Sequence, residues 1–335
     1  MRAYIQDLEY SLPDLVLTND ALKLKNPHWN IQHIEQRAGV FSRHIAGPNE
    51  TALDFAYRAS LKLLDRNPDL RAKIDAVIFC TQSGDHILPS NACLLHKLLE
   101  LPDEVIAYDF NLACSGFIYG LSIVQGLISS KQARNILLVT GDTYSKYIHA
   151  QDRAAGALFG DGTAVTWFVG SEDDGLVDLI CATSGKDSDK FIIPAGGCRK
   201  QRSPETAIPI RDLGGNVRTL EHIHMDGMGV LSFVKEKIPR QVETLLNRNG
   251  LSLATVDRII FHQASKVALD WLDGFFQIEA GKSFRNLSHI GNTVSASIPI
   301  ALKDAIDQGQ VRPGHKVLLV GFGVGLSYAS AIIRI

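Results

Sequence analysis

The sequence predicts an α/β protein made of two similar halves, and three observations support this. Short runs rich in valine, isoleucine and leucine alternate with longer helical patterns, which indicates strands joined by crossover helices. The same order of segments occurs twice, at an offset of roughly 180 residues, which indicates an internal duplication. A length of 335 residues suits two domains at about 150 residues per domain.

In the first half, hydrophobic runs that end at Gly, Pro, Asp or Ser predict strands and helices in alternation. The longest mainly apolar stretch, Ala113–Ile128, is shorter than the ~20 residues of a membrane helix and predicts a buried helix. The predicted strands are Ile74–Thr81, Val105–Asn111, Asn135–Gly141 and Thr163–Val169, and the predicted helices are Asn91–Leu101 and Ser115–Ser129.

The second half repeats this order. A polar cluster at 170–175 predicts the boundary, so we expect halves at residues 1–172 and 173–335. Paired α/β units bind ligands where the carboxyl ends of their strands converge, so functional residues are expected at strand ends in both halves. The corresponding segments are Val256–Gln263 with Ile74–Gln82, Gly291–Gln308 with Ala113–Ser129, and Lys316–Gly321 with Ile136–Gly141.

Composition excludes several classes of protein. The 34 Lys and Arg residues nearly balance the 36 Asp and Glu residues, which argues against nucleic acid as the main partner. The N-terminus has no signal-peptide core and no segment suits membrane insertion. Five cysteines without a C-x-x-C pair favour a reducing compartment over a disulfide framework. We therefore expect a cytoplasmic protein.

Cys114 is the cysteine whose setting best fits a nucleophile. It follows the predicted strand Val105–Asn111 and opens the next helix. The positive end of a helix dipole favours a thiolate, and Gly116 would let a substrate approach the backbone. A buried packing role is the alternative from the residues alone. Packing is the interpretation for Cys80, Cys93 and Cys181, whereas Cys198 is expected to be accessible but has no base nearby.

His262 and Asn292 are the matching polar residues of the second half. His262 ends a predicted strand, where it either faces a ligand or packs with its hydrogen bonds satisfied. Asn292 lies at a predicted helix start, and taken alone it suits an N-cap. His222 and His224 have no third ligand at suitable spacing, so no metal site is expected.

Glycine-rich segments predict turns. The run Gly321–Gly325 does not complete a G-x-G-x-x-G fingerprint and is interpreted as a tight turn near a ligand. Residues Leu326–Ile335 predict a terminal strand. In the turn Gly160–Gly162, Asp161 is expected to hold loop backbone.

Taken together, the motifs resemble the 3-oxoacyl-ACP synthase III family of the thiolase superfamily over essentially the whole chain. The resemblance implies a thiolase-like fold, with two α/β halves forming five α-β-α-β-α layers. Elongating synthases and thiolases differ in having a second His where Asn292 stands. The motifs that carry the resemblance are Ser11–Pro13, Arg37–Val40, Arg43–Ala46, Leu88–Ser90, Ala113–Phe117, Phe159–Gly162, Pro194–Gly197, Met225–Gly227, His262–Ala264, Gly291–Thr293 and the closing glycine turn.

The resemblance implies a Cys114–His262–Asn292 triad and a two-step reaction. The Cys114 thiolate would take an acyl group from acyl-CoA or acyl-ACP, with the backbone N–H groups of Cys114 and Val324 holding the oxyanion. His262 and Asn292 would then stabilise the enolate formed by decarboxylation of a malonyl thioester, expected to be malonyl-ACP. No cofactor is implied beyond these thioester substrates. Val324 departs from the family's usual three glycines and is expected to narrow the pocket.

Substrate contacts follow from the same resemblance. Arg37 and Arg153 match positions that contact the CoA nucleotide, although ordinary surface arginines are the alternative. Leu88 matches a position that reaches the partner subunit's acyl pocket, which implies a homodimer. Because the familiar enzymes carry Phe there, the smaller Leu88 suggests the hypothesis that a longer acyl chain is admitted.

Two departures from the family pattern lie near the expected substrate entrance. His33 stands where typical bacterial members have a tryptophan that stacks on adenine, and Ser265 replaces an asparagine. CoA recognition and the choice of donor therefore stay open. So do acyl transfer to an oxygen or nitrogen acceptor without decarboxylation, and a non-catalytic partner subunit, although the intact triad argues against the latter.

Overall fold

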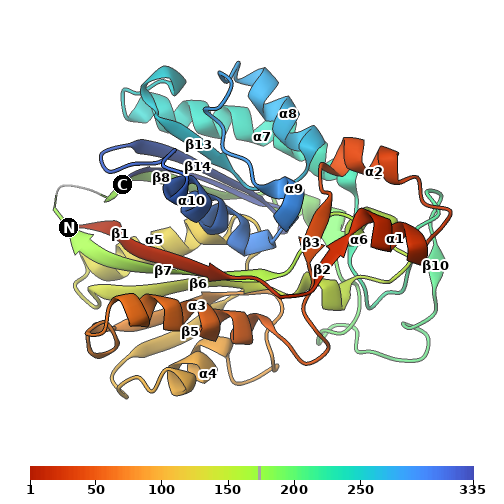
Figure 1. Cartoon of the computed structure of the whole chain (residues 1–335), viewed down its shortest axis with the longest axis horizontal. Helices are drawn as coiled ribbons and strands as arrows, with labels where there is room; N and C mark the ends of the chain where they lie inside the picture. Colours follow the sequence, from red (N-terminus) through yellow and green to blue (C-terminus); the bar gives the residue numbers. More distant parts are fainter. Residues whose placement is uncertain (173–174) are drawn as a thin grey trace.

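The computed structural model describes residues 1–172 and 175–335. Two large sheets alternate with three layers of helices (Figure 1). The layer order is α-β-α-β-α, which confirms the expected fold class. One outer layer holds α3 (Ala52–Arg66) and α4 (Asn91–Leu98), the central layer holds α5 (Gly116–Ser129) and α10 (Ser297–Asp307), and the other outer layer holds α7 (Gly227–Arg248) and α8 (Lys266–Phe275).

The first sheet contains the four strands predicted for the first half, and also the N-terminal strand, which was not predicted. Its order is β1 (Arg2–Ser11), β7 (Gly162–Ser171), β6 (Asn135–Asp142), β4 (Ala76–Cys80) and β5 (Ile106–Phe110). Strand β4 is parallel to β5 and β6, whereas β7 is antiparallel to both its neighbours. Every residue of β4 is buried, because helices cover both faces of the sheet at its centre.

The second sheet repeats the parallel pairing of the first with fewer strands. Its order is β13 (Arg258–Phe261), β14 (Lys316–Gly323), β15 (Ser327–Arg334) and β8 (Gly175–Thr183). Strands β13 and β14 are parallel, and β15 is antiparallel to both its neighbours. The terminal strand β15 was predicted, whereas β8 was not. Residues 173–174 of the expected boundary lie outside the described residues.

Helix α5 packs between the two sheets, as its apolar composition predicts. It contacts β6 of the first sheet and β14 of the second. Gly120 has no space for a side chain, because an added Cβ would lie 2.6 Å from a methyl group of Leu138. A helix that is apolar on most sides is stable only where both faces are covered. The residues just before α5 are therefore held between the two halves of the protein.

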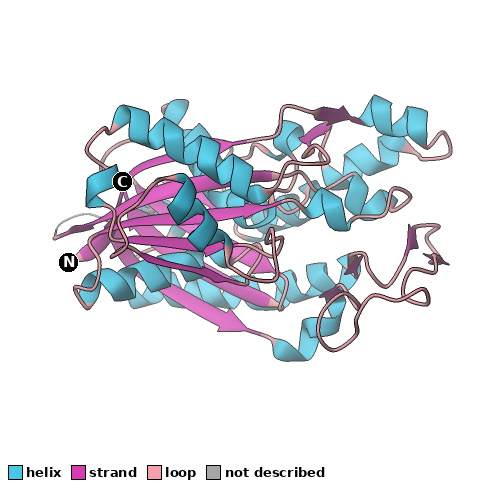
Figure 2. Ribbon diagram, turned by 90° about the horizontal axis from the view of Figure 1, so that it is seen from below, coloured by secondary structure: helices cyan, strands magenta, loops and turns pink. Residues whose placement is uncertain are grey.

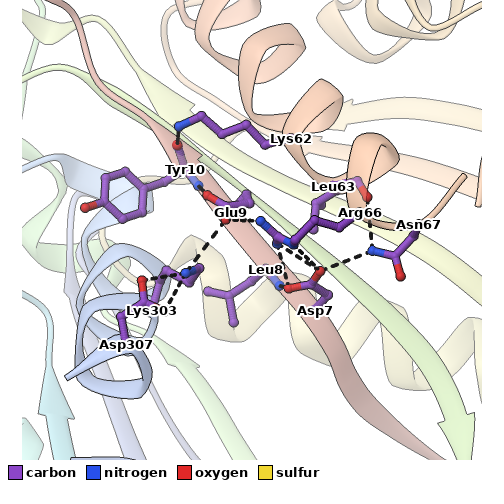
Figure 3. A network of polar contacts seen from close by, with 10 residues as sticks. All are labelled: Asp7, Leu8, Glu9, Tyr10, Lys62, Leu63, Arg66, Asn67, Lys303 and Asp307. Atoms are coloured by element: carbon purple, nitrogen blue, oxygen red, sulfur yellow. Dashed lines mark hydrogen bonds and ion pairs between the residues drawn. The ribbon is translucent and has the colours of Figure 1, made fainter. Parts of the chain in front are cut away.

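A polar network joins the two halves at one side of the sheets (Figure 3). The guanidinium of Arg66 on α3 contacts the carboxylates of Asp7 and Glu9 on β1. Lys303 of α10 lies 3.7 Å from Glu9 and 2.5 Å from Asp307. The network thus connects an outer helix, an edge strand and a central helix that belong to different halves.

Shorter elements gather at the end of the molecule opposite the two termini (Figures 1 and 2). They carry much of the wall of the cavity described below. The helices there are α1 (Asn19–Lys25), α2 (Ile31–Ala38), α6 (Arg153–Gly156) and α9 (Leu287–Ile290), and the strands are β2 (Val16–Thr18), β3 (Ser42–His44), β9 (Phe191–Ile192), β10 (Ile210–Arg211), β11 (Val217–Arg218) and β12 (His224–Met225).

The remaining elements are short 3-10 helices, at Arg71–Lys73, Tyr144–Tyr147, Gly185–Lys190, Leu253–Thr255 and Val294–Ala296. The helix predicted to reach Leu101 ends at Leu98. Throughout residues 1–172 and 175–335, no helix has the length and apolar character needed to cross a bilayer.

Candidate active site

A cavity of about 430 Å³ leads from the protein surface to Cys114. Exposed residues of α2 and the first turn of α7, including His33, Arg37 and Met228, line its outer part. Buried side chains line its inner part, and those of Cys114, His262 and Asn292 are among them. The structure therefore brings together the three residues expected to form a triad, from both halves of the chain.

Cys114 is held between the end of β5 and the start of α5. Gly323 at the end of β14 packs against it so closely that an added Cβ would lie 2.7 Å from the Cys114 Sγ atom. The neighbouring Ser115 hydroxyl lies 2.7 Å from the hydroxyl of Ser327 on β15, which ties the loop to the second sheet. Both sheets thus fix the position of the thiol.

The expected role of Gly116 is wrong. An added Cβ there would overlap the Sγ atom of Cys80, so this glycine makes room for a neighbouring side chain in the core. The approach of a substrate to the backbone does not depend on it.

The expectation that the helix terminus yields a thiolate is also corrected. Burial raises the pKa of the Cys114 thiol, and the buried carboxyl of Asp142 raises it further. Hydrogen bonds from the backbone N–H groups of Cys114 and Val324 oppose this rise. Burial and Asp142 therefore oppose the thiolate that the helix N-terminus and the two backbone donors favour. The same two backbone donors were expected to form the oxyanion hole, and both point toward the sulfur.

His262 lies directly after β13, and its backbone N–H donates to the Val320 carbonyl at 2.7 Å. Its Nδ1 atom is 2.6 Å from the Ser297 hydroxyl, and its ring packs edge-on against Phe322. Burial lowers the pKa of His262 to about 3, so the imidazole is neutral at physiological pH. It is therefore a hydrogen-bonding group and a poor base.

Asn292 is oriented by its own loop. Its Oδ1 atom accepts a hydrogen bond from the Val294 N–H at 2.9 Å, and its Nδ2 group donates to the Ala264 carbonyl at 3.3 Å and lies 3.4 Å from His262 Nε2. Its backbone pairs with Leu158 and Gly160 of the first half, both at 3.0 Å. Asn292 caps the turn at Val294–Ala296, whereas α10 begins only at Ser297.

Of the other expected site residues, three line the cavity and two do not. Arg37, Arg153 and Ser265 line the cavity with His33, although Arg153 also donates to the Gly214 carbonyl at 3.2 Å. Ser265 caps α8 by accepting a hydrogen bond from Ala268 N–H. In the part of the chain that is described, neither the Leu88 nor the Val324 side chain lines the cavity. Val324 therefore does not narrow it as expected.

Leu88 lies on the surface of the chain and is 79% exposed, and its expected contact with a partner subunit stays a prediction.

Asp142 is a buried carboxyl near the site that sequence reasoning missed. It accepts hydrogen bonds from the Gln82 N–H at 2.7 Å and from the Ser295 hydroxyl at 2.7 Å. Burial raises its pKa to about 7, against the lowering effect of these hydrogen bonds. The available signal was a charged residue directly after the apolar run Asn135–Gly141.

Other residues singled out in the sequence have structural roles. Asp161 accepts hydrogen bonds from the backbone of Ala46 and Ser145, as expected. His222 and His224 both bond to Thr219, and no metal-ligand cluster occurs among the described residues. The prediction that Cys93 is buried is wrong, because it lies on the exposed face of α4.

Comparisons with known proteins agree with this architecture. The family model described as 3-Oxoacyl-[acyl-carrier-protein (ACP)] synthase III matches residues 108–185, and the model of its C-terminal part matches residues 246–335. The beta-ketoacyl-[acyl-carrier-protein] synthase III of Chlamydia caviae is 31% identical over 326 residues, covering 96% of this chain and 94% of its own length.

Solved structures also resemble this chain over its whole length. A crystal structure of a 3-oxoacyl-(acyl-carrier-protein) synthase III superposes with a TM-score of 0.97 at 38% identity, over 100% of both chains. The 3-oxoacyl-(acyl-carrier protein) synthase of Burkholderia xenovorans LB400 has a TM-score of 0.92 at 30% identity, over 100% of this chain and 94% of its own.

Proposed function

This chain belongs to the 3-oxoacyl-ACP synthase III family, and on that premise we propose that Cys114, His262 and Asn292 condense an acyl group with malonyl-ACP. It is an acyltransferase that forms a 3-oxoacyl thioester from an acyl thioester and a malonyl thioester. The observation that carries the residue assignment is the convergence of these three side chains at the inner end of one cavity.

In the first half-reaction, the Cys114 sulfur attacks the carbonyl carbon of an acyl-CoA or acyl-ACP. A new carbon–sulfur bond forms, the bond to the carrier sulfur breaks, and the carrier leaves as a thiol with the proton from Cys114. Backbone N–H groups of Cys114 and Val324 donate to the transient oxyanion. This role is supported by the hydrogen bonds that these groups make at the sulfur itself.

In the second half-reaction, a malonyl thioester binds with its carbonyl oxygen facing His262 and Asn292. The bond to the carboxyl carbon breaks, carbon dioxide leaves, and the electron pair forms an enolate. Neutral donors at His262 Nε2 and Asn292 Nδ2 stabilise that oxygen. The carbanion attacks the acyl carbon, and the Cys114 sulfur departs and recovers a proton. The low pKa of His262 supports this role, since it keeps the imidazole uncharged.

The carrier arm occupies the outer part of the cavity in this scheme. Arg37 and Arg153 pair with phosphates of CoA, and Ser265 and His33 contact the arm or nucleotide where relatives have other residues. The exposure of Arg37 at the outer end of the cavity supports this arrangement. The reaction takes place without a metal or a further cofactor.

The active unit is a homodimer in this proposal. Ile87 and Leu88 are adjacent apolar residues that are 100% and 79% exposed, which suits a position against a partner subunit. Leu88 then approaches the acyl pocket of the partner. Because the mechanism requires a free thiol at Cys114, we also propose a reducing compartment, the cytoplasm.

The test is to incubate the protein with a series of acyl-CoAs and measure its intact mass. We expect an acyl adduct that disappears in Cys114→Ala, followed by release of carbon dioxide and a 3-oxoacyl product after malonyl-ACP is added. An ester or amide product without carbon dioxide would instead identify simple acyl transfer, which the comparisons do not favour. No adduct with either acyl-CoAs or acyl-ACPs would contradict the proposed role of Cys114.

A further inference from the structure

The turn that follows Asn292 contains a strained residue. Val294 has a φ angle of 54°, in the left-handed region, which a side chain branched at Cβ strongly disfavours. In the described part of the chain, the other non-glycine residues with positive φ are Glu100, Lys131 and Gln277, and all three are exposed, whereas Val294 is fully buried. Strain of this kind persists only where surrounding contacts hold it, and it is frequent at functional sites.

The strained turn orients the side chain of Asn292. The Val294 N–H donates to Asn292 Oδ1 at 2.9 Å, and the Nδ2 group at the other end of the amide lies 3.4 Å from His262 Nε2. The oxygen and nitrogen ends of an amide have nearly the same shape, so a hydrogen bond has to decide which end points where. The Val294 N–H therefore determines that the nitrogen of Asn292, and not its oxygen, lies beside His262.

Hydrogen bonds hold the backbone on both sides of Val294. Before it, the Asn292 N–H donates to the Leu158 carbonyl and the Asn292 carbonyl accepts from the Gly160 N–H, both at 3.0 Å. After it, the Ser295 hydroxyl donates to the Asp142 carboxyl at 2.7 Å, and neither of these two side chains is exposed. The left-handed conformation is thus fixed by the first half of the protein at both ends of the turn.

Asp142 is a rigid anchor for Ser295. It lies at the end of β6, and its other carboxyl oxygen accepts hydrogen bonds from the Gln82 N–H at 2.7 Å and the Thr81 hydroxyl at 3.2 Å. These contacts come from the loop after β4, which does not belong to the Asn292 turn. The Ser295 hydroxyl is therefore the side-chain contact through which this buried carboxyl reaches the turn.

Resting on the function proposed above, we propose that Ser295, anchored by Asp142, is a positioning residue that holds the Asn292 amide in the orientation needed for condensation. With Ser295 released, Val294 can return to the negative φ that its branched side chain prefers, and its N–H then leaves Asn292 Oδ1. The Asn292 amide loses its fixed direction, and the enolate oxygen loses one of its two donors. Acylation uses other donors in the proposed reaction, so it does not depend on this turn.

The test measures two rates for the full-length protein, with the acyl-CoA that gives the most adduct. One is the rate of adduct formation, and the other is the rate of carbon dioxide release after malonyl-ACP is added. In Ser295→Ala we expect unchanged adduct formation and about a tenfold fall in condensation, since the anchoring hydrogen bond is lost. A purely structural role for Ser295 would lower stability without separating the two rates.

Thr81→Val is the matched control, because it removes another buried hydroxyl that donates to Asp142, at 3.2 Å, and leaves the Asn292 turn intact. Its ratio of condensation to acylation should match that of the unmodified protein.

Val294→Gly tests whether Ser295 acts by holding strain. Glycine adopts a φ of 54° without a steric penalty, so the turn no longer needs an anchor. In the Val294→Gly background, Ser295→Ala should therefore slow condensation by about twofold or less. If Val294→Gly fails to fold, Val294→Asn replaces it, because asparagine adopts the left-handed region more readily than other residues with a side chain.

The outcomes separate this inference from the proposed function. Unchanged condensation in Ser295→Ala, or equal losses in both half-reactions, would overturn the inference while the adduct at Cys114 keeps the function intact. A loss in the Val294→Gly background as large as in the unmodified one would likewise overturn it. No adduct with any acyl thioester on the unmodified protein would instead overturn the function itself.

Discussion

The Nδ1 atom of His262 lies 2.6 Å from the hydroxyl oxygen of Ser297, and both side chains are only 2% exposed. A serine hydroxyl that donates to Nδ1 leaves the proton of a neutral imidazole on Nε2. That nitrogen is the one facing Asn292 and the cavity. We expect the Ser297 hydroxyl to donate to Nδ1, so that the proton on Nε2 is free to be donated to a bound substrate.

We therefore predict that Ser297→Ala slows condensation more than acylation. Loss of one buried hydrogen bond of about 1.5 kcal/mol corresponds to roughly a tenfold fall in the condensation rate. The measurement is kcat for the complete reaction with malonyl-ACP, compared with the rate of adduct formation alone. Ser297→Thr, which keeps the hydroxyl, is expected to restore most of the rate. Equal losses in both half-reactions would contradict a positioning role.

Substitutions of His262 and Asn292 are also predicted to slow condensation more than acylation. His262→Ala and Asn292→Ala should still form the acyl adduct at Cys114, because neither side chain supplies the oxyanion donors of that step. Condensation should fall by about 100-fold or more, since a donor to the enolate oxygen is lost. Product formation measured by mass spectrometry separates the two steps.

Asn292→Asp is the sharpest control for this assignment, since it keeps the shape of the side chain but replaces the Nδ2 donor with an acceptor. Its condensation rate should be at least as low as that of Asn292→Ala. A variant that condenses normally but no longer acylates would exclude the proposed roles.

Asp142 is predicted to make stability depend on pH. Because its pKa rises to about 7 in the folded protein, the folded state keeps a proton that the unfolded state releases near the ordinary aspartate pKa of 3.8. The contribution of Asp142 to the free energy of unfolding therefore falls as pH rises across this window. Urea midpoints of the unmodified protein and of Asp142→Asn, measured at about pH 4 and about pH 8, test this.

The difference in urea midpoint between the two proteins reports on the titration of Asp142 alone, because asparagine does not titrate and the other carboxyl groups are the same in both. We expect the stability of Asp142→Asn relative to the unmodified protein to be greater at the higher pH. An unchanged difference between the two variants across this range would show that Asp142 keeps an ordinary pKa in the folded protein.

The network around Arg66 is predicted to contribute modestly to stability. Arg66 is 45% exposed, so solvent screens its contacts with Asp7 and Glu9. Arg66→Ala should lower the free energy of unfolding by about 1 kcal/mol, with a smaller effect near 1 M salt. Arg58→Ala is the matched control, because Arg58 lies on the same helix with Glu50 as its ion-pair partner. An equal or larger effect at Arg58 would contradict a role for the network.

Strand prediction succeeded where hydrophobic runs were continuous and failed where the pattern was mixed. Nearly every residue of β4 and β6 is buried, so both strands are continuous apolar runs that can be recognised from composition alone. Strand β1 carries Asp7 and Glu9 between apolar residues, and β8 carries Asp178, which hides both strands from a search for continuous apolar runs. The position of Cys93 was mistaken for a related reason, since an apolar helix still has one face toward solvent.

The sequence by itself determined the duplicated α/β architecture, because strand ends and helix starts are recorded in local patterns of residues. Those patterns left the roles of Cys114, His262 and Asn292 open, and the resemblance to a known family joined them into one triad. Tertiary structure alone decided that these side chains share one cavity and that burial raises the pKa of the thiol and lowers that of the imidazole. It also decided that the Ser297 hydroxyl contacts the His262 ring. This contact joins residues distant in the chain, and desolvation depends on every group packed around a site.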